Sequence, residues 1–179
     1  MDYQTLQQTK QACARGQKRG LHFILASVLI WAMVAAVHFT KLPIETKNLL
    51  TFCCTCPLIP LAWLLSKPLG IIFSDKQNPL SSLGIVLSVA QIPYLLIVMW
   101  VYAAMPDKMV MTLAMVFGAH LLPFGWLYDS KVYYAMTGFI TIGALIVGLM
   151  LPPQVLALCM IAVETIFCLL LHFENKNLK

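Results

Sequence analysis

Three polar side chains stand inside long apolar runs of this sequence: Gln91, His120 and Glu164. An ionisable residue within a membrane-spanning helix is costly, and it is by default a candidate functional residue. A carboxyl group alone in lipid would take up a proton, whereas one beside an imidazolium would stay ionised. Because imidazole also titrates near neutral pH, both arrangements suit a site that carries protons or binds a polar solute.

His120 belongs to a stretch, residues 118–131, that combines a disturbed helix with a polar end. Two glycines and a proline flank the imidazole, and they are expected to loosen the helix so that backbone carbonyls face a cavity. The stretch ends at Tyr128 and Asp129. Aromatic and charged residues of this kind mark a membrane–water interface. A solvated rim and a cytoplasmic gate or headgroup contact are both compatible with them.

The composition indicates that these side chains are carried by membrane helices. Of 179 residues, 60% are hydrophobic and only 11% are charged, against roughly 25% charged in a soluble domain. The formal charge of +5 arises partly from four Lys and Arg just before the first apolar run. The positive-inside rule places Lys and Arg at this position. The expected partner is therefore the lipid bilayer, and a nucleic-acid partner is not expected.

Six apolar runs are long enough to cross a hydrocarbon core of about 30 Å. The predicted spans are residues 21–39, 49–65, 80–104, 109–128, 132–150 and 154–172. The predicted fold is therefore an all-α, six-transmembrane-helix bundle over residues 21–172. A basic segment, residues 1–20, precedes it as a short surface helix with a thin apolar stripe, and a tail, residues 173–179, follows. Residues 67–76 either form a loop or dip into the membrane.

The distribution of Lys and Arg predicts the orientation of the bundle. With the N-terminus inside, nine Lys and Arg fall on the inner side and three on the outer side. The positive-inside rule then places both termini in the cytoplasm. In this orientation Gln91, His120 and Glu164 each lie about ten or eleven residues from a membrane face, which puts all three near the midplane. The structural alternative is that they only form interhelical hydrogen bonds.

A short internal echo joins two of the predicted spans. Residues 57–66 align without gaps on residues 120–129, and the two segments share Leu, Pro, Trp and Leu. Both spans run in the same direction, so the echo would be a parallel repeat with Trp63 and Trp126 near the inner interface. Chance recurrence of Pro and Trp in membrane helices is the alternative.

No metal or cofactor is expected from the sequence. Three cysteines within residues 53–56, together with nearby methionines, offer soft ligands for monovalent copper, but both residue types are also ordinary packing residues in lipid. Of the four histidines only His22 and His172 fall at a matched depth, at the inner edge, and a single pair at the membrane edge disfavours haem. The sequence lacks Walker, GxSxG, HExxH and Rossmann patterns, so no catalytic residue is assigned.

The run GAHLLPFGW at residues 118–126, with the Pro-rich second span and Asn78-Pro79-Leu80 before the third, resembles a family of small bacterial integral membrane proteins with no assigned activity. The resemblance implies six spans and a bacterial inner membrane. It carries over no catalytic or binding residue.

The function expected from these observations is a small transporter or channel-like permease that moves a proton or a small polar solute. Its expected substrate-binding residues are Gln91, His120, Glu164, Tyr128 and Asp129. Six spans are few for an independent carrier, so transport would call for a homodimer.

Two other functions stay open. The first is an intramembrane enzyme on a lipid or isoprenoid, with His120 or Glu164 as acid or base and with Asp129 and Lys131 at the headgroup. The second is an accessory membrane subunit without a site. The deep position of the polar residues favours transport over headgroup chemistry.

Overall fold

The structure, a computed structural model that describes residues 2–176, is built from helices, with no strand among these residues. The elements are α1 (Tyr3–Gln17), η1 (Lys18–Gly20), α2 (Leu21–His38), α3 (Ile44–Thr55), α4 (Leu58–Ser66), α5 (Pro79–Val89), α6 (Gln91–Ala104), η2 (Pro106–Lys108), α7 (Met109–His120), α8 (Leu122–Leu127), α9 (Lys131–Met150) and α10 (Pro153–Lys176). Six helical segments are long and apolar enough to cross a membrane. The prediction of an all-α, six-span membrane protein is confirmed.

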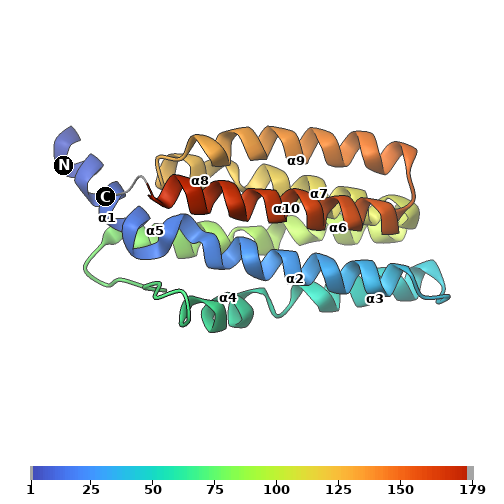
Figure 1. Cartoon of the computed structure of the whole chain (residues 1–179). Helices are drawn as coiled ribbons and strands as arrows, with labels where there is room; N and C mark the ends of the chain where they lie inside the picture. The colour runs from blue at the N-terminus through green and yellow to red at the C-terminus, as the bar shows by residue number, and fades with distance from the viewer. Residues whose placement is uncertain (1, 177–179) are drawn as a thin grey trace.

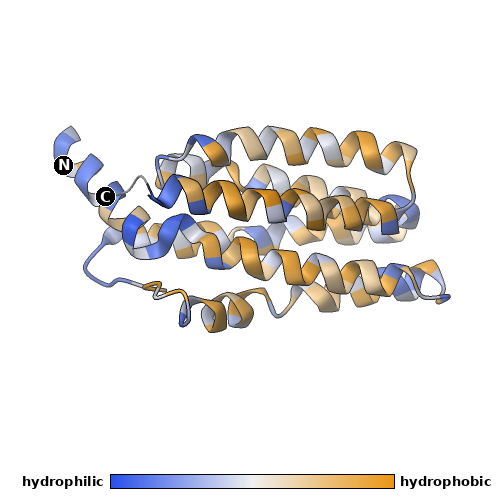
Figure 2. Ribbon diagram, viewed as in Figure 1, coloured by the Kyte–Doolittle hydropathy of each residue, from blue (hydrophilic) through white to orange (hydrophobic). Residues whose placement is uncertain are grey.

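Hydrophobic residues cover the middle of the bundle, and hydrophilic residues gather at its two ends (Figure 2). This distribution matches a hydrocarbon core between two aqueous faces. Both ends of the chain lie at one end of the bundle (Figure 1), which we call the terminal end. Spans 1, 5 and 6 correspond to α2, α9 and α10.

Spans 2, 3 and 4 are each broken into two shorter helices. The breaks fall at Cys56 between α3 and α4, at Ala90 between α5 and α6, and at Leu121 between α7 and α8. Each break lies within about one turn before a proline, which lacks an N–H group and clashes with the carbonyl four residues earlier. Broken helices within a membrane are tolerated where they are buried in protein or line a cavity.

The spans pack as an incomplete ring in the order 2–1–6–5–4–3. α2 packs on α10 and on α3 and α4, α10 packs on α9, α9 packs on α7, and α7 packs on α6. The weakly packed side of the ring lies between span 2 and span 3. In the most apolar stretch of spans 2 and 3 only 17% of the residues are buried, against 50% in span 4.

Small residues explain how closely α7 and α9 pack. Gly118 and Ala114 of α7 and Gly148 and Ala144 of α9 are buried. A Cβ atom added to Gly118 would lie 2.7 Å from Thr141 Oγ1 and 2.9 Å from the Thr141 backbone nitrogen. Close approach of this kind replaces the missing hydrophobic driving force between helices in lipid.

The terminal end is covered by α1, by η1 and by the connection between α4 and α5. α1 buries Cys13 and Gln17 against the bundle, although its sequence offers only a thin apolar stripe. Residue Ile72 of the connection donates its N–H to the Gly16 carbonyl at 2.9 Å. α10 continues through Lys176, so the segment predicted as a tail is partly helical; residues 177–179 lie outside the described residues.

Candidate functional site

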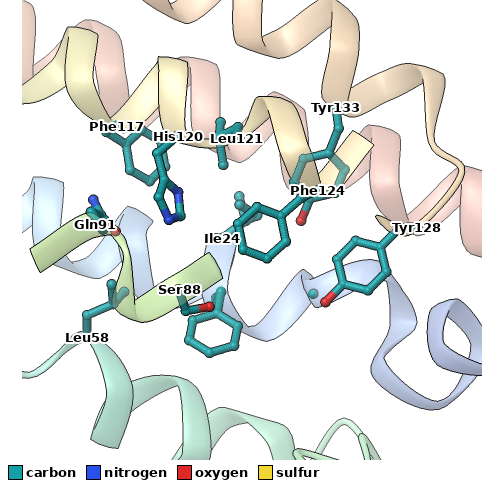
Figure 3. Close-up of a pocket in the computed structure, with 12 residues that line it drawn as sticks. Ile24, Leu58, Ser88, Gln91, Phe117, His120, Leu121, Phe124, Tyr128 and Tyr133 are labelled. Atoms are coloured by element: carbon teal, nitrogen blue, oxygen red, sulfur yellow. The ribbon is translucent and has the colours of Figure 1, made fainter. Parts of the chain in front are cut away.

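A cavity of about 40 Å³ lies inside the bundle, next to the breaks of spans 3 and 4. Gln91, His120 and Tyr128 line it together with Ser88 and aromatic and aliphatic side chains. In Figure 3 the His120 ring descends from α7 into this space, with Gln91 on one side of it and Phe124 on the other. A volume of this size holds about two or three water molecules. Three of the five predicted site residues therefore line one cavity.

His120 is the last residue of α7, so its side chain projects at the break of span 4. Its Nε2 atom lies 2.8 Å from the carbonyl oxygen of Leu87, which is in the last turn of α5. A carbonyl only accepts, so Nε2 carries the proton and Nδ1 is an acceptor. Nδ1 is buried and has no hydrogen-bond partner within residues 2–176. His120 thus joins two broken helices and still offers one free lone pair.

Gln91 begins α6, directly after the break of span 3, and it connects the first cavity with two others. A second cavity of about 40 Å³ and a third of about 290 Å³ are both lined by Gln91 and Leu58. We call these three adjoining cavities the central cleft. The third cavity opens between α4 and α6, and Ile59 and Ile92 at its rim are 46% and 58% exposed.

Glu164 lies outside the central cleft. Its side chain is fully buried between α10 and α2, and Ser27 and Trp31 of α2 face its carboxyl group. Neither carboxyl oxygen has a hydrogen-bond partner of standard geometry in the part of the chain that the structure describes. Glu164 and His120 therefore do not bond to each other. Ser27 and Trp31 also line the second cavity, so they separate Glu164 from the cleft.

The central cleft is uncharged. Among the described residues, no Asp, Glu, Lys or Arg lines any of its three cavities. Its polar groups are several hydroxyls, the Cys56 thiol, the Trp31 indole N–H, the Gln91 amide and the His120 imidazole. Asp129, which the sequence placed in the site, is instead exposed in the turn between α8 and α9, with a positive φ of 49°. It does not line the cleft.

Tyr128 closes the terminal end of the first cavity through a buried hydrogen-bond network. Its hydroxyl donates to Gln17 Oε1 at 2.7 Å, and Gln17 Nε2 donates to Ser81 Oγ at 3.0 Å. The Ser81 oxygen also accepts the backbone N–H of Asp75 at 3.0 Å. The last turn of α1 is therefore fixed directly over the cavity. Sequence reasoning missed Gln17 and Ser81.

A second network joins η1, just before span 1, to the last turn of α10. Arg19 Nη1 donates to the Glu174 carbonyl at 3.0 Å and to Asn175 Oδ1 at 3.1 Å. Arg19 Nε lies 3.4 Å from Glu174 Oε2, which also accepts the Ser130 hydroxyl at 2.6 Å. Burial lowers the pKa of Arg19, and the carboxylate of Glu174 opposes that shift. Arg19 stays charged because the guanidinium pKa is so high.

Three consecutive residues at the start of span 1 adopt positive φ angles: Lys18, Arg19 and Gly20. This conformation costs about 1–2 kcal/mol for each non-glycine residue, so neighbours must hold it in place. Tyr133 donates its hydroxyl to the Arg19 carbonyl at 2.8 Å, and Asn175 Nδ2 donates to the Lys18 carbonyl at 2.9 Å. Gly20 lines the first cavity, where a Cβ atom would lie 3.0 Å from the Tyr133 hydroxyl.

One signal in the sequence could have found the Arg19–Glu174 pair. Arg19 lies just before span 1 and Glu174 just after span 6, so opposite charges stand at one membrane face. Comparing the depths of Arg19 and Glu174, as for the midplane residues, would place both side chains at this face. No comparable signal exists for Gln17, because nothing in its local sequence indicates that α1 docks on the bundle. No group of three or more His, Cys, Asp or Glu suited to a metal ion occurs in the described residues.

The fold and the cleft define a polytopic membrane protein whose central spans are broken around an internal, uncharged cleft. The chain matches Family of unknown function (DUF7010) over residues 6–174 and belongs to that family. This agrees with the resemblance to a membrane protein family of unassigned activity. No curated protein and no solved structure matches the chain.

Proposed function

We propose that the protein is a small transporter or channel-like permease, and that its cargo binds in the central cleft at Gln91 and His120. One observation carries this proposal: the breaks of three consecutive spans surround one cleft near the middle of the bundle. Transporters commonly build their binding sites from discontinuous helices at this depth, where free backbone groups and loosened helices surround the substrate.

Proton coupling is part of the proposal, with Glu164 as the protonated group. The buried Glu164 carboxyl has no hydrogen-bond partner in residues 2–176, so it is not explained by a role in holding helices together. Ionisable residues inside membrane helices often mark proton pathways. Ser27 and Trp31 stand between Glu164 and the second cavity and contact both, so a proton would reach the cleft by way of the Ser27 hydroxyl. Glu164 would then act on the cargo site without touching it.

The test is proton flux in liposomes that contain a pH-sensitive dye and purified protein. After a pH jump, we expect the protein to collapse the gradient faster than empty liposomes do. Glu164→Gln should reduce the rate to that of empty liposomes, and His120→Gln should reduce it severalfold. His172→Gln and Glu45→Gln are matched controls, because both residues are exposed. Undiminished flux in Glu164→Gln would remove proton coupling through this residue.

An intramembrane enzyme on a lipid or isoprenoid is the second candidate. The opening of the central cleft between two lipid-facing helices favours a lipid-like substrate, and the free Nδ1 of His120 supplies a base. Asp129 and Lys131 contribute nothing to the cleft because they are exposed at the terminal end. Incubation with labelled lipid extract tests this candidate. Absence of any new product in both detergent and liposomes would count against it.

We infer that the protein resides in a bacterial inner membrane as a homodimer with both termini in the cytoplasm. The excess of Lys and Arg at the terminal end supports this orientation. A fluorescent protein fused after Lys179 should fold and fluoresce, whereas alkaline phosphatase fused there should be inactive. Active phosphatase would reverse the orientation. Light scattering of the purified protein checks the dimer.

A further inference from the structure

The amide of Gln91, like Nδ1 of His120, is a polar group of the central cleft without a hydrogen-bond partner among the described residues. Gln91 lines all three cavities, and its amide makes no hydrogen bond within the described residues. The neighbouring hydroxyls of Thr55 and Ser88 already donate to the carbonyls of Phe52 and Gly84. In hydrocarbon, an amide without partners is costly. The cleft therefore presents free N–H donors and acceptors to whatever fills it.

The walls around this amide are apolar and open to the side. The largest cavity, about 290 Å³, is lined by aliphatic residues of α4 and α6 as well as Phe23. Ile59 and Ile92 at its rim are large exposed hydrophobics at the middle of two membrane spans. A molecule dissolved in the hydrocarbon can thus reach the cleft without passing an aqueous face. The volume lies at the lower end of the range of about 300–1,000 Å³ typical of ligand pockets.

Charge also restricts the occupant. None of the described residues that line the cleft is Asp, Glu, Lys or Arg. An ion in this position would be desolvated without a counter-charge, which is strongly unfavourable. The first cavity holds only water-sized molecules, so an extended apolar chain fits the third cavity alone.

We propose that the central cleft binds an uncharged, mostly apolar lipid alcohol that enters sideways between α4 and α6, and that the Gln91 amide recognises its hydroxyl group. The hydroxyl donates to Gln91 Oε1 and accepts from Gln91 Nε2, while the hydrocarbon chain lies along Ile59 and Ile92. This inference rests on the proposed cargo site at Gln91 and specifies the class of cargo.

The test measures binding of three related probes to the whole protein in lipid nanodiscs at equal mole fraction in the lipid. The probes are the isoprenoid alcohol farnesol, the hydrocarbon farnesene and the charged ester farnesyl phosphate. We expect saturable binding of farnesol, about threefold to tenfold weaker binding of farnesene, which lacks one hydrogen-bonding group, and no measurable binding of farnesyl phosphate. Equal binding of farnesol and farnesene, or stronger binding of the phosphate, would overturn the proposal.

The variant Gln91→Leu should bind farnesol and farnesene equally, because it removes the amide and keeps the volume. Gln154→Leu in the first turn of α10 lies outside the cleft and should keep the preference for the alcohol. If Gln91→Leu unfolds, Gln91→Asn replaces it, since the shorter amide should weaken farnesol binding while preserving a polar group. A preference for farnesol that survives both substitutions would refute recognition by Gln91.

Cys56 gives an independent measurement, because it is exposed and lines the cleft. In a variant that keeps only this cysteine, farnesol should protect Cys56 from a maleimide reagent and farnesyl phosphate should not. Efficient Cys56–Cys56 cross-linking that farnesol leaves unchanged would show a second copy in the cleft and contradict the proposal. Farnesol binding without proton flux would instead contradict only the transport function.

Discussion

At the scale of single residues, His120 illustrates how one side chain serves structure and site together. Its Nε2–H bond to the Leu87 carbonyl joins the end of α7 to the last turn of α5. The opposite ring nitrogen stays free beside the first cavity. A proton added at Nδ1 would leave the bond to Leu87 intact. The imidazole can therefore change charge without releasing the two helices that it connects.

Glu164 should contribute little to stability despite its complete burial. Glu164→Gln keeps the shape of the side chain and removes an ionisable group that has no hydrogen-bond partner in residues 2–176. We expect the free energy of unfolding to stay within about 1 kcal/mol of the wild-type value or to rise, since neutral replacements of buried ionisable groups are often tolerated. Denaturation in detergent measures it, with the exposed Glu45→Gln as the control. A loss above about 2 kcal/mol would indicate an essential ionised partner.

At the scale of elements, the contact between α7 and α9 depends on Gly118. Gly118→Ala places a methyl group against the backbone of Thr141, and we expect it to cost about 1–3 kcal/mol. Gly143→Ala on α9 is the matched control, because a Cβ atom there meets nothing within 4 Å. It should be neutral or stabilise the helix by up to about 1 kcal/mol. Thermal unfolding of both variants tests this prediction. Equal melting temperatures for Gly118→Ala and Gly143→Ala would contradict the close packing of α7 on α9.

Docking of α1 can be followed through the reactivity of Cys13. Burial, and secondarily the charge of Asp75, raise the pKa of the Cys13 thiol to about 11. At neutral pH the thiol should therefore react slowly with maleimide, because little thiolate is present. Gln17→Leu removes the hydrogen bonds to Tyr128 and Ser81 and should release α1. In a variant that keeps only Cys13, we expect labelling to become about tenfold faster or more.

Gln8→Leu is the control for this experiment, because Gln8 is exposed on the same helix. The labelling rate of Cys13 should rise with pH in the docked protein, as the thiolate fraction grows. If Gln17→Leu and Gln8→Leu label at the same rate, Gln17 does not hold α1 in place.

The internal echo between residues 57–66 and 120–129 can be compared with the structure at this scale. Both aligned segments begin at a helix break, since α4 and α8 follow the breaks of spans 2 and 4. Both tryptophans also make a cation–π contact with a lysine. Lys67 Nζ lies 3.7 Å from the Trp63 ring centroid, and Lys10 Nζ lies 4.4 Å from the Trp126 ring centroid. Lys67 directly follows its own segment, whereas Lys10 comes from α1, and the position that corresponds to Lys67 after the second segment is Ser130. The lysines are therefore not equivalent, and the parallel repeat stays a prediction.

At the scale of the whole molecule, the Arg19–Glu174 pair closes the bundle. Arg19→Gln and Glu174→Gln should each lower the free energy of unfolding by about 1.5–3 kcal/mol, the usual value of hydrogen bonds to charged groups. The double variant should lose less than the sum, with a coupling energy of about 1 kcal/mol. Arg15→Gln is the control, because Arg15 is exposed. A coupling energy near zero would show that the two side chains act independently.

The spans could be predicted from sequence because length and hydropathy determine them, and prolines mark the breaks at Cys56, Ala90 and Leu121. Gln91 and His120 were predicted to lie at the same depth in the membrane, and they line one cavity. Glu164 has the same depth, yet it faces α2, because depth does not specify which side of a helix a residue occupies. Gln17 escaped prediction because its partners, Tyr128 and Ser81, lie more than sixty residues away.

The Arg19–Glu174 contact also sets the order in which the bundle can mature during synthesis. Arg19 emerges from the ribosome 155 residues before the carbonyl to which it donates. Until α10 is inserted, only the Tyr133 hydroxyl of α9 can hold the left-handed turn, because the bond from Asn175 to the Lys18 carbonyl is still missing. Spans 1 to 5 therefore enter the bilayer with the first helix held loosely at its start. A nascent chain that stops before residue 174 would lack both the carboxylate and the carbonyl that bind this guanidinium.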